Sequence, residues 1–140
     1  MIRPYRSDDL KAVMQIWYEA SKVGHPFFSE QELAEDRIEI IEKYIPVARQ
    51  WVYDEGGQIL GFIALLEKHI GGLFVAPEYH RRGIGTKLIE HAKSIHERLT
   101  VGVFKANPIA RRFYEKCGFR FVEELACRTT GRPELILEWK

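Results

Sequence analysis

Residues 73–88 read LFVAPEYHRRGIGTKL, a pattern that predicts a strand, a turn rich in Arg and Gly, and the first turn of an amphipathic helix. Such a helix start directs several backbone N–H groups, and the positive end of the helix dipole, to one point. Arg81, Arg82 and Lys87 add full positive charges around that point. The stretch therefore indicates a site for a phosphate or pyrophosphate, the group that nucleotide cofactors carry.

Further elements follow on both sides of this stretch. Alternating and β-branched patterns predict strands at residues 2–6, 51–53, 59–66, 69–75, 99–104, 119–129 and 135–139. Caps at Ser7 or Asp8, Ser29 and Asn107 begin three of the four expected helices, and Gly118 ends the last. Gly71 and Gly72 inside the fourth strand indicate a bulge or the close approach of a ligand. The order β-α-α-β-β-β-α-β-α-β-β predicts a mixed α/β domain over residues 1–140.

Composition excludes some classes of partner. The formal net charge is +1, so the chain as a whole has no field that would attract nucleic acid or a membrane surface.

Cys117 and Cys127 have neither a CxxC nor a zinc spacing, and we expect two reduced thiols, with a disulfide between them left open. We see no signal sequence and no apolar run long enough for a membrane span, so we expect a cytoplasmic protein.

Residues 82–86 are similar to two phosphate-binding motifs but match neither of them completely. The dinucleotide fingerprint G-x-G-x-x-G would need a third Gly where Leu88 stands. The Walker motif needs Gly-Lys-Ser or Gly-Lys-Thr, whereas this chain has Gly85-Thr86-Lys87. A purely structural role, in which the glycines only permit a tight turn, fits this stretch alone equally well.

A second segment decides between these alternatives. Residues 107–119 read NPIARRFYEKCGF. Together the two segments resemble the GNAT acetyltransferase superfamily, with its motifs Q/R-x-x-G-x-G/A and N-x-x-A/S-x-x-F/L-Y-x-x-x-G-F, in the manner of a small single-domain bacterial or archaeal member. The resemblance covers nearly the whole chain. It implies a central mixed, mostly antiparallel sheet of about six or seven strands flanked by about four helices. It also implies transfer of an acetyl group from acetyl-CoA, as co-substrate, to an amine by direct attack, without a metal.

The resemblance assigns residues to acetyl-CoA. The strand that carries the pantetheine arm matches Leu73, Phe74 and Val75. The pyrophosphate cradle matches the amides of Arg81, Arg82, Gly83, Ile84, Gly85 and Thr86, where the two glycines let the backbone come close to the ligand. Asn107 matches a residue that binds the pantetheine arm, besides its role as a helix cap, and Arg111 is available for phosphates. His80 departs from the family's Gln or Arg, which predicts a mild pH dependence of CoA affinity.

The resemblance also implies the catalytic groups. Tyr114 matches the general acid that protonates the departing thiolate, with a packing role as its alternative, although Phe113 fits packing better. The family's basic carboxylate would lie where Gly71 and Gly72 stand, so the base stays open between His69, Glu67, His25 and a water relay. Direct transfer is expected over a covalent route through Cys117.

The segment His25-Pro26-Phe27-Phe28-Ser29 lies between the first two helices, where this family shapes the acceptor pocket. We expect His25 to point at the acceptor while Phe27 or Phe28 packs on the core, and assign His25 and Phe28 to the substrate site. The alternative is a hydrophobic staple that precedes the Ser29 cap.

The resulting hypothesis is an N-acetyltransferase that acts on a primary amine: a protein lysine, an N-terminus or a small amine. The absence of a carboxylate on the fourth strand keeps a non-catalytic acyl-CoA sensor open as the alternative. A nucleic-acid or protein-interaction module is disfavoured by the near-zero charge. A homodimer that pairs edge strands is a further expectation from the resemblance.

Overall fold

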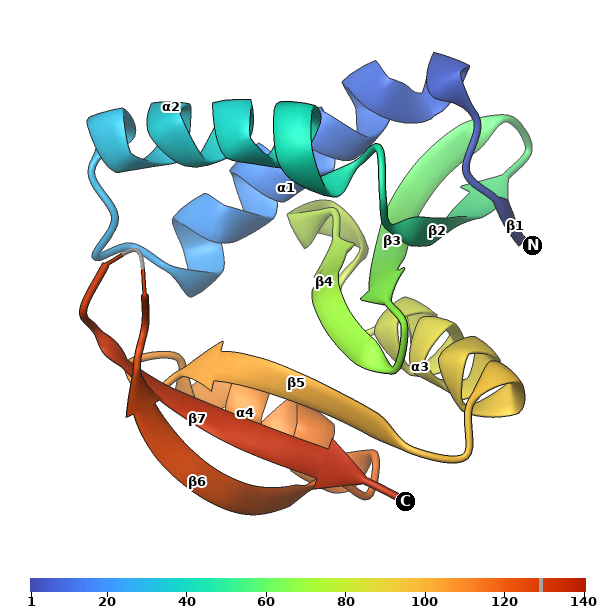
Figure 1. Cartoon of the computed structure of the whole chain (residues 1–140). Helices are drawn as coiled ribbons and strands as arrows, with labels where there is room; N and C mark the ends of the chain where they lie inside the picture. The colour runs from blue at the N-terminus through green and yellow to red at the C-terminus, as the bar shows by residue number, and fades with distance from the viewer. Residues whose placement is uncertain (129) are drawn as a thin grey trace.

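The computed structural model describes residues 1–128 and 130–140 and forms one seven-stranded sheet in the order β1-β2-β3-β4-β5-β7-β6 (Figure 1). The strands are β1 Ile2–Pro4, β2 Arg49–Glu55, β3 Gln58–Leu66, β4 His69–Val75, β5 Leu99–Phe104, β6 Arg120–Ala126 and β7 Pro133–Trp139. The α-helices are α1 Leu10–Gly24, α2 Glu30–Glu39, α3 Ile84–Ile95 and α4 Pro108–Lys116. All neighbouring strands are antiparallel except the parallel pair β4 and β5. The predicted mixed, mostly antiparallel fold is confirmed.

Two of the three predicted helix starts and the predicted stop agree with the structure. The cap expected at Ser7 or Asp8 is wrong, because residues 7–9 form a separate 3-10 turn and Asp9 is the N-cap of α1. Ser29 and Glu32 form a capping box before α2, and the Asn107 side chain accepts a hydrogen bond from the N–H of Ala110 at the start of α4. Gly118 follows α4 with φ +93°. The strand expected at 119–129 is β6, and Thr129 lies outside the described residues.

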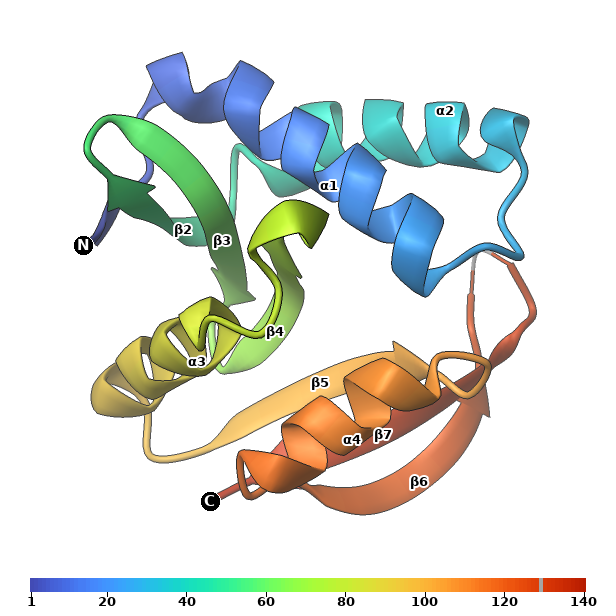
Figure 2. The same ribbon diagram turned by 180° about the vertical axis from the view of Figure 1, so that it is seen from behind.

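Apolar side chains form a core on each face of the sheet. One core joins α3 and α4 to the sheet through fully buried residues such as Leu88, Leu99 and Leu137, and Figure 2 shows both helices over this face. The other core joins α1 and α2 to the sheet through residues such as Met14 and Val52. Each such side chain contributes about 1.5–3 kcal/mol on burial. The sheet therefore divides the molecule into two layers, with β4 and β5 in its centre.

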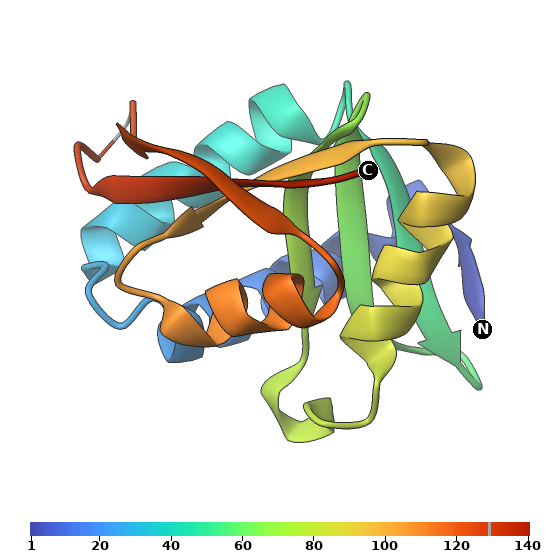
Figure 3. The same ribbon diagram turned by 90° about the horizontal axis from the view of Figure 1, so that it is seen from below.

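The sheet opens between β4 and β5. These two strands pair only at His69↔Thr100 and Ile70↔Val101. The register against β3 shifts next to this point, so that Gly71 has no partner, and the bulge predicted at the two glycines is confirmed there. Beyond the bulge the strands diverge, and Figure 3 shows the green strands β3 and β4 running across the orange and red strands β5 and β7.

Candidate active site

The cradle, which we define as residues 81–86, presents backbone donors at the start of α3. The N–H of Lys87 donates to Gly83 O (3.0 Å), so the N–H groups of Ile84, Gly85 and Thr86 come before the helical hydrogen-bond ladder. Arg81 and Gly83 have positive φ, 68° and 78°, which turns the chain sharply into the helix. Donors without helical partners and the positive end of the helix dipole make this an anion site.

Glycine is required at positions 83 and 85 of the cradle for different physical reasons. Gly83 needs its left-handed φ, and a Cβ built there would meet nothing within 4 Å, so the space in front of it is open to a ligand. A Cβ at Gly85 would lie 3.2 Å from the ring of Phe113. Gly85 therefore lets α3 pack closely on α4, in addition to the ligand role expected from the sequence.

Side chains near the cradle are already engaged. His80 Nε2 lies 2.9 Å from Val75 O, and because a carbonyl only accepts, this nitrogen carries the proton. Arg82 pairs with Glu55 (3.1 Å) on the exposed surface. Arg111, which the resemblance makes available for phosphates, lies beside Glu115 and over the ring of Phe121 on β6. Arg82 and Arg111 thus have carboxylate neighbours, the backbone N–H groups of the cradle are directed to an anion, and His80 anchors the turn.

The edge of β4 that faces β5 presents peptide groups that the sheet does not use, and among them Val75 O accepts from His80. The N–H of Ala76 donates to Leu60 O, so by the two-residue period of a strand the peptide of Phe74 is directed to β3. The peptides of Leu73 and Val75 are directed to the opposite, diverging side. The peptide of Leu73 and the N–H of Val75 can therefore bind an extended ligand arm, whereas the ring of Phe74 packs against the ring of Phe62.

Tyr114 lies in α4 within the core on the α3–α4 face. It is 5% exposed and its ring contacts those of Phe113 and Phe119, at centroid distances of 5.1 and 5.3 Å. Burial raises the pKa of Tyr114, and the nearby Cys117 adds to the shift. The hydroxyl therefore keeps its proton at neutral pH, and it makes no hydrogen bond to the part of the chain that the structure describes.

Leu99, Val101 and Val103 on β5 point into the core on the α3–α4 face. The opposite side of β5, which we call the Phe104 face, carries Thr100, Gly102 and Phe104. His69 Nδ1 lies 2.9 Å from Thr100 Oγ1 on this face, and burial lowers the pKa of His69. Glu67 lies in the exposed turn between β3 and β4.

An aromatic cluster covers one end of the Phe104 face. The rings of His25, Phe27, Phe28 and Phe104 lie 5.1–5.6 Å apart. Arg132, just before β7, lies over the Phe27 and Phe28 rings, donates to Phe27 O (3.1 Å) and pairs with Glu32 (2.7 Å). The chain between α1 and α2 is thus tied to the chain between β6 and β7 (Figure 1).

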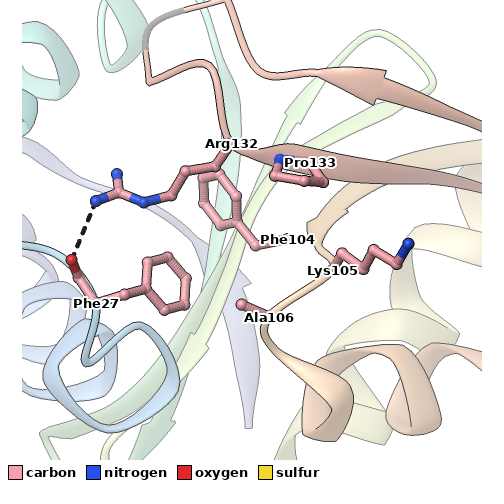
Figure 4. A pocket seen from close by; sticks show the side chains of 6 residues that line it. All are labelled: Phe27, Phe104, Lys105, Ala106, Arg132 and Pro133. Carbon is pink, nitrogen blue, oxygen red and sulfur yellow. Dashed lines mark hydrogen bonds between the residues drawn. The ribbon is translucent and has the colours of Figure 1, made fainter.

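A pocket of about 350 Å³ lies against this aromatic cluster (Figure 4). Its lining residues are Phe27, Phe104, Lys105, Ala106, Arg132 and Pro133. Figure 4 shows the Arg132 guanidinium reaching the backbone oxygen of Phe27, which closes one side of the pocket. The walls are rings and aliphatic stems, so the pocket fits an apolar chain better than a charged group.

Comparison with known sequences identifies the family of the chain. A sequence model described as the acetyltransferase (GNAT) domain matches residues 46–121, from the start of the β2–β3 hairpin to the end of the Tyr114 segment. The chain belongs to the GNAT acetyltransferase family. As a GNAT protein it is an acyltransferase, and the family predicted from residues 73–88 and 107–119 is confirmed.

Individual GNAT relatives match over almost the entire length. The chain is 32% identical over 140 residues to the peptidyl-lysine N-acetyltransferase YiaC of Escherichia coli (strain K12), covering 99% of this chain and 96% of YiaC. The solution structure of apo-form YjaB from Escherichia coli has a TM-score of 0.88 at 29% identity, covering 99% of this chain and 96% of that chain. An acetyltransferase from Bacillus anthracis str. Ames, solved in complex with acetyl coenzyme A, shares the fold (TM-score 0.70, 20% identity, 99% and 97% covered).

The described part of the chain holds no group of three or more His, Cys, Asp or Glu side chains that could bind a metal ion. Among its described helices none has the length and apolar character to cross a membrane.

Gly102 and Arg132 are features of the site that the sequence analysis did not identify. The isolated Gly inside a strand of β-branched residues is a signal that could have marked residue 102.

His25 makes the stability of this GNAT domain depend on pH. Burial lowers the pKa of His25 to about 4, whereas an unfolded chain has a value of about 6.5. Between those values the unfolded state binds the extra proton, so the free energy of unfolding falls as the pH falls, by up to about 1.4 kcal/mol per pH unit. Denaturant unfolding at pH 7, 6 and 5 should show a shallower pH dependence for His25→Asn than for wild type, and parallel curves would contradict the assignment.

Proposed function

We propose that this chain transfers the acetyl group of acetyl-CoA to the ε-amine of a lysine in a protein, by direct attack within a ternary complex. The observation that carries the proposal is the alignment of three features along one line: the cradle, the free edge of β4 and the opening between β4 and β5. The relatives YiaC and YjaB are named peptidyl-lysine N-acetyltransferases, which supports lysine as the acceptor.

Hydrogen bonds from the backbone bind acetyl-CoA in this proposal. The diphosphate accepts hydrogen bonds from the amides of the cradle, and the pantetheine arm bonds to the peptides of Leu73 and Val75. Such bonds from amides to a charged group are stronger than neutral ones. The acetyl thioester then reaches the point where β4 and β5 part, with Asn107 bonding the arm from the start of α4.

Tyr114 supplies the proton that the leaving group needs. The amine nitrogen forms a bond to the acetyl carbon, and the C–S bond breaks with its electron pair on sulfur. Two protons must leave the original ammonium group: one passes to a base before the attack, and the second replaces the proton that Tyr114 gives to sulfur. The raised pKa of the buried Tyr114 keeps its hydroxyl protonated until that step.

A lysine side chain suits the Phe104 face. Its four-carbon stem can lie along the aromatic cluster and the apolar pocket, while its amine reaches the opening between the strands. His25 and Phe28 then contact the stem of the acceptor. Acceptors with a bulky group next to the amine fit this wall less well.

The test is release of free CoA thiol from acetyl-CoA in the presence of lysine-containing peptides. Release that depends on an unmodified lysine, and that stops when the lysine is already acetylated, is the expected result. A peptide with a free N-terminus and no lysine is the matched control. Binding of acetyl-CoA without thiol release with any peptide would contradict the proposal and favour an acyl-CoA sensor.

A further inference from the structure

The carboxylate of Glu134, on β7, lies flat against Gly102, on β5. A Cβ built on Gly102 would be 2.8 Å from Glu134 Cδ, and 3.0 and 3.1 Å from its two carboxylate oxygens. The volume that any other residue at position 102 would fill is therefore occupied by this carboxylate. Glycine at this position, poor as a strand residue, is explained by the close approach.

Position 102 lies where the pairing between β4 and β5 ends. Gly102 is the first residue of β5 beyond the last pair with β4, Ile70↔Val101. Glu134 pairs in register with Phe104, so its side chain is on the Phe104 face, opposite the core that holds Tyr114. The carboxylate of Glu134 thus lies beside the point where the strands part, on the face of the sheet opposite Tyr114.

Within the described residues Glu134 has no cationic partner, unlike two neighbouring carboxylates. Glu124 on β6 pairs with Lys105 (3.1 Å), and Glu138 on β7 pairs with Arg98. The side chain of Glu134 makes no hydrogen bond or ion pair with residues 1–128 and 130–140. Burial raises the pKa of Glu134, and no charged neighbour offsets that effect. A desolvated carboxylate without a partner is costly, and a cationic ligand would relieve that cost.

We propose that Glu134 binds the ammonium group of the acceptor and takes its first proton, so that the neutral amine attacks the thioester. This inference rests on the proposed lysine acetyltransferase function and names its base. The proton moves from nitrogen to a carboxylate oxygen of Glu134 and then to water, while the second proton of the ammonium replaces the one given by Tyr114. The carboxylate that the sequence lacks on β4 is thus supplied from β7, across β5.

The other candidate bases have different surroundings. His69 is held by Thr100, and Glu67 lies in an exposed turn at the end of β4 away from the cradle. Neither carries an unpaired negative charge beside the opening, whereas Glu134 does. A negative charge is what an ammonium group needs before it can lose its proton.

Glu134→Gln tests the base directly, with Glu124→Gln as the matched change on the neighbouring strand. With a lysine peptide, Glu134→Gln should lower kcat by about 10²- to 10⁴-fold, the usual contribution of a general base, and leave the Kd of acetyl-CoA unchanged. With a peptide whose lysine amine is replaced by an aminooxy group, which is unprotonated at neutral pH, the same variant should react as fast as wild type.

Gly102→Ala provides a second route to the same answer. The added methyl displaces the flexible end of Glu134 without changing its charge, so the protein should fold and lose at least about 10-fold in kcat with lysine but not with the aminooxy peptide. Wild-type activity in Glu134→Gln, or equal losses with both peptides, would overturn the inference while leaving the acetyltransferase function intact. Failure of the wild-type protein to acetylate lysine would instead contradict the proposed function itself.

Discussion

Replacing Tyr114 by Phe is expected to lower kcat by about 10²- to 10⁴-fold while the Kd of acetyl-CoA stays the same. The change removes one hydroxyl, which is the proton donor for the thiolate in our proposal. The ring contacts with Phe113 and Phe119 remain, so the fold should be preserved. Steady-state kinetics of thiol release and a calorimetric titration with acetyl-CoA measure the two quantities separately.

Tyr5→Phe is the control for this change. Tyr5 also has a pKa raised by burial, but it packs against the core on the α1–α2 face. We expect wild-type kinetics from Tyr5→Phe. Unchanged kcat in a folded Tyr114→Phe protein would assign Tyr114 to packing alone and remove it from the mechanism.

Gly83→Asp is expected to weaken acetyl-CoA binding by roughly 5- to 1000-fold relative to Gly83→Asn. Both residues tolerate a left-handed backbone better than most, and they have the same shape, so the pair differs mainly in charge. A carboxylate about 4 Å from a diphosphate charge costs about 1 kcal/mol in water and about 4 kcal/mol near a protein surface, which gives the stated range. Calorimetric titrations of the two variants give the ratio of their Kd values.

A second control separates the cradle from general effects of a new charge. Gly57 also has a positive φ, 93°, and a Cβ there would meet nothing within 4 Å, but it lies in the β2–β3 turn. Gly57→Asp should bind acetyl-CoA like wild type. Equal affinities for Gly83→Asp and Gly83→Asn would show that the diphosphate lies elsewhere.

Local signals in the sequence predicted most of the elements. Ser29 with Glu32, Asn107 with Pro108, and Gly118 are caps and stops whose effect depends only on nearby backbone groups, and each is found in that role. The cradle was also predictable from local signals, because the start of a helix is determined by consecutive residues. The bulge at Gly71 was predictable for the same reason.

Contacts between distant strands were not predictable from one sequence. β7 inserts between β5 and β6, and this order brings Glu134 against Gly102. The tie between Arg132 and Glu32 likewise joins segments that are far apart in the chain. The periodicity of a sequence indicates which residues share a face of one strand, but it does not indicate which strands pair. The carboxylate beside Gly102 was therefore not predictable, because it comes from β7 and not from β4.

A crystal structure of the protein with acetyl-CoA tests the central claim most directly. We expect the diphosphate on the amides of residues 83–86, the pantetheine arm along Leu73 and Val75, and the thioester sulfur within hydrogen-bond distance of the Tyr114 hydroxyl. A complex with the diphosphate away from the start of α3, or with the thioester away from Tyr114, would contradict the account.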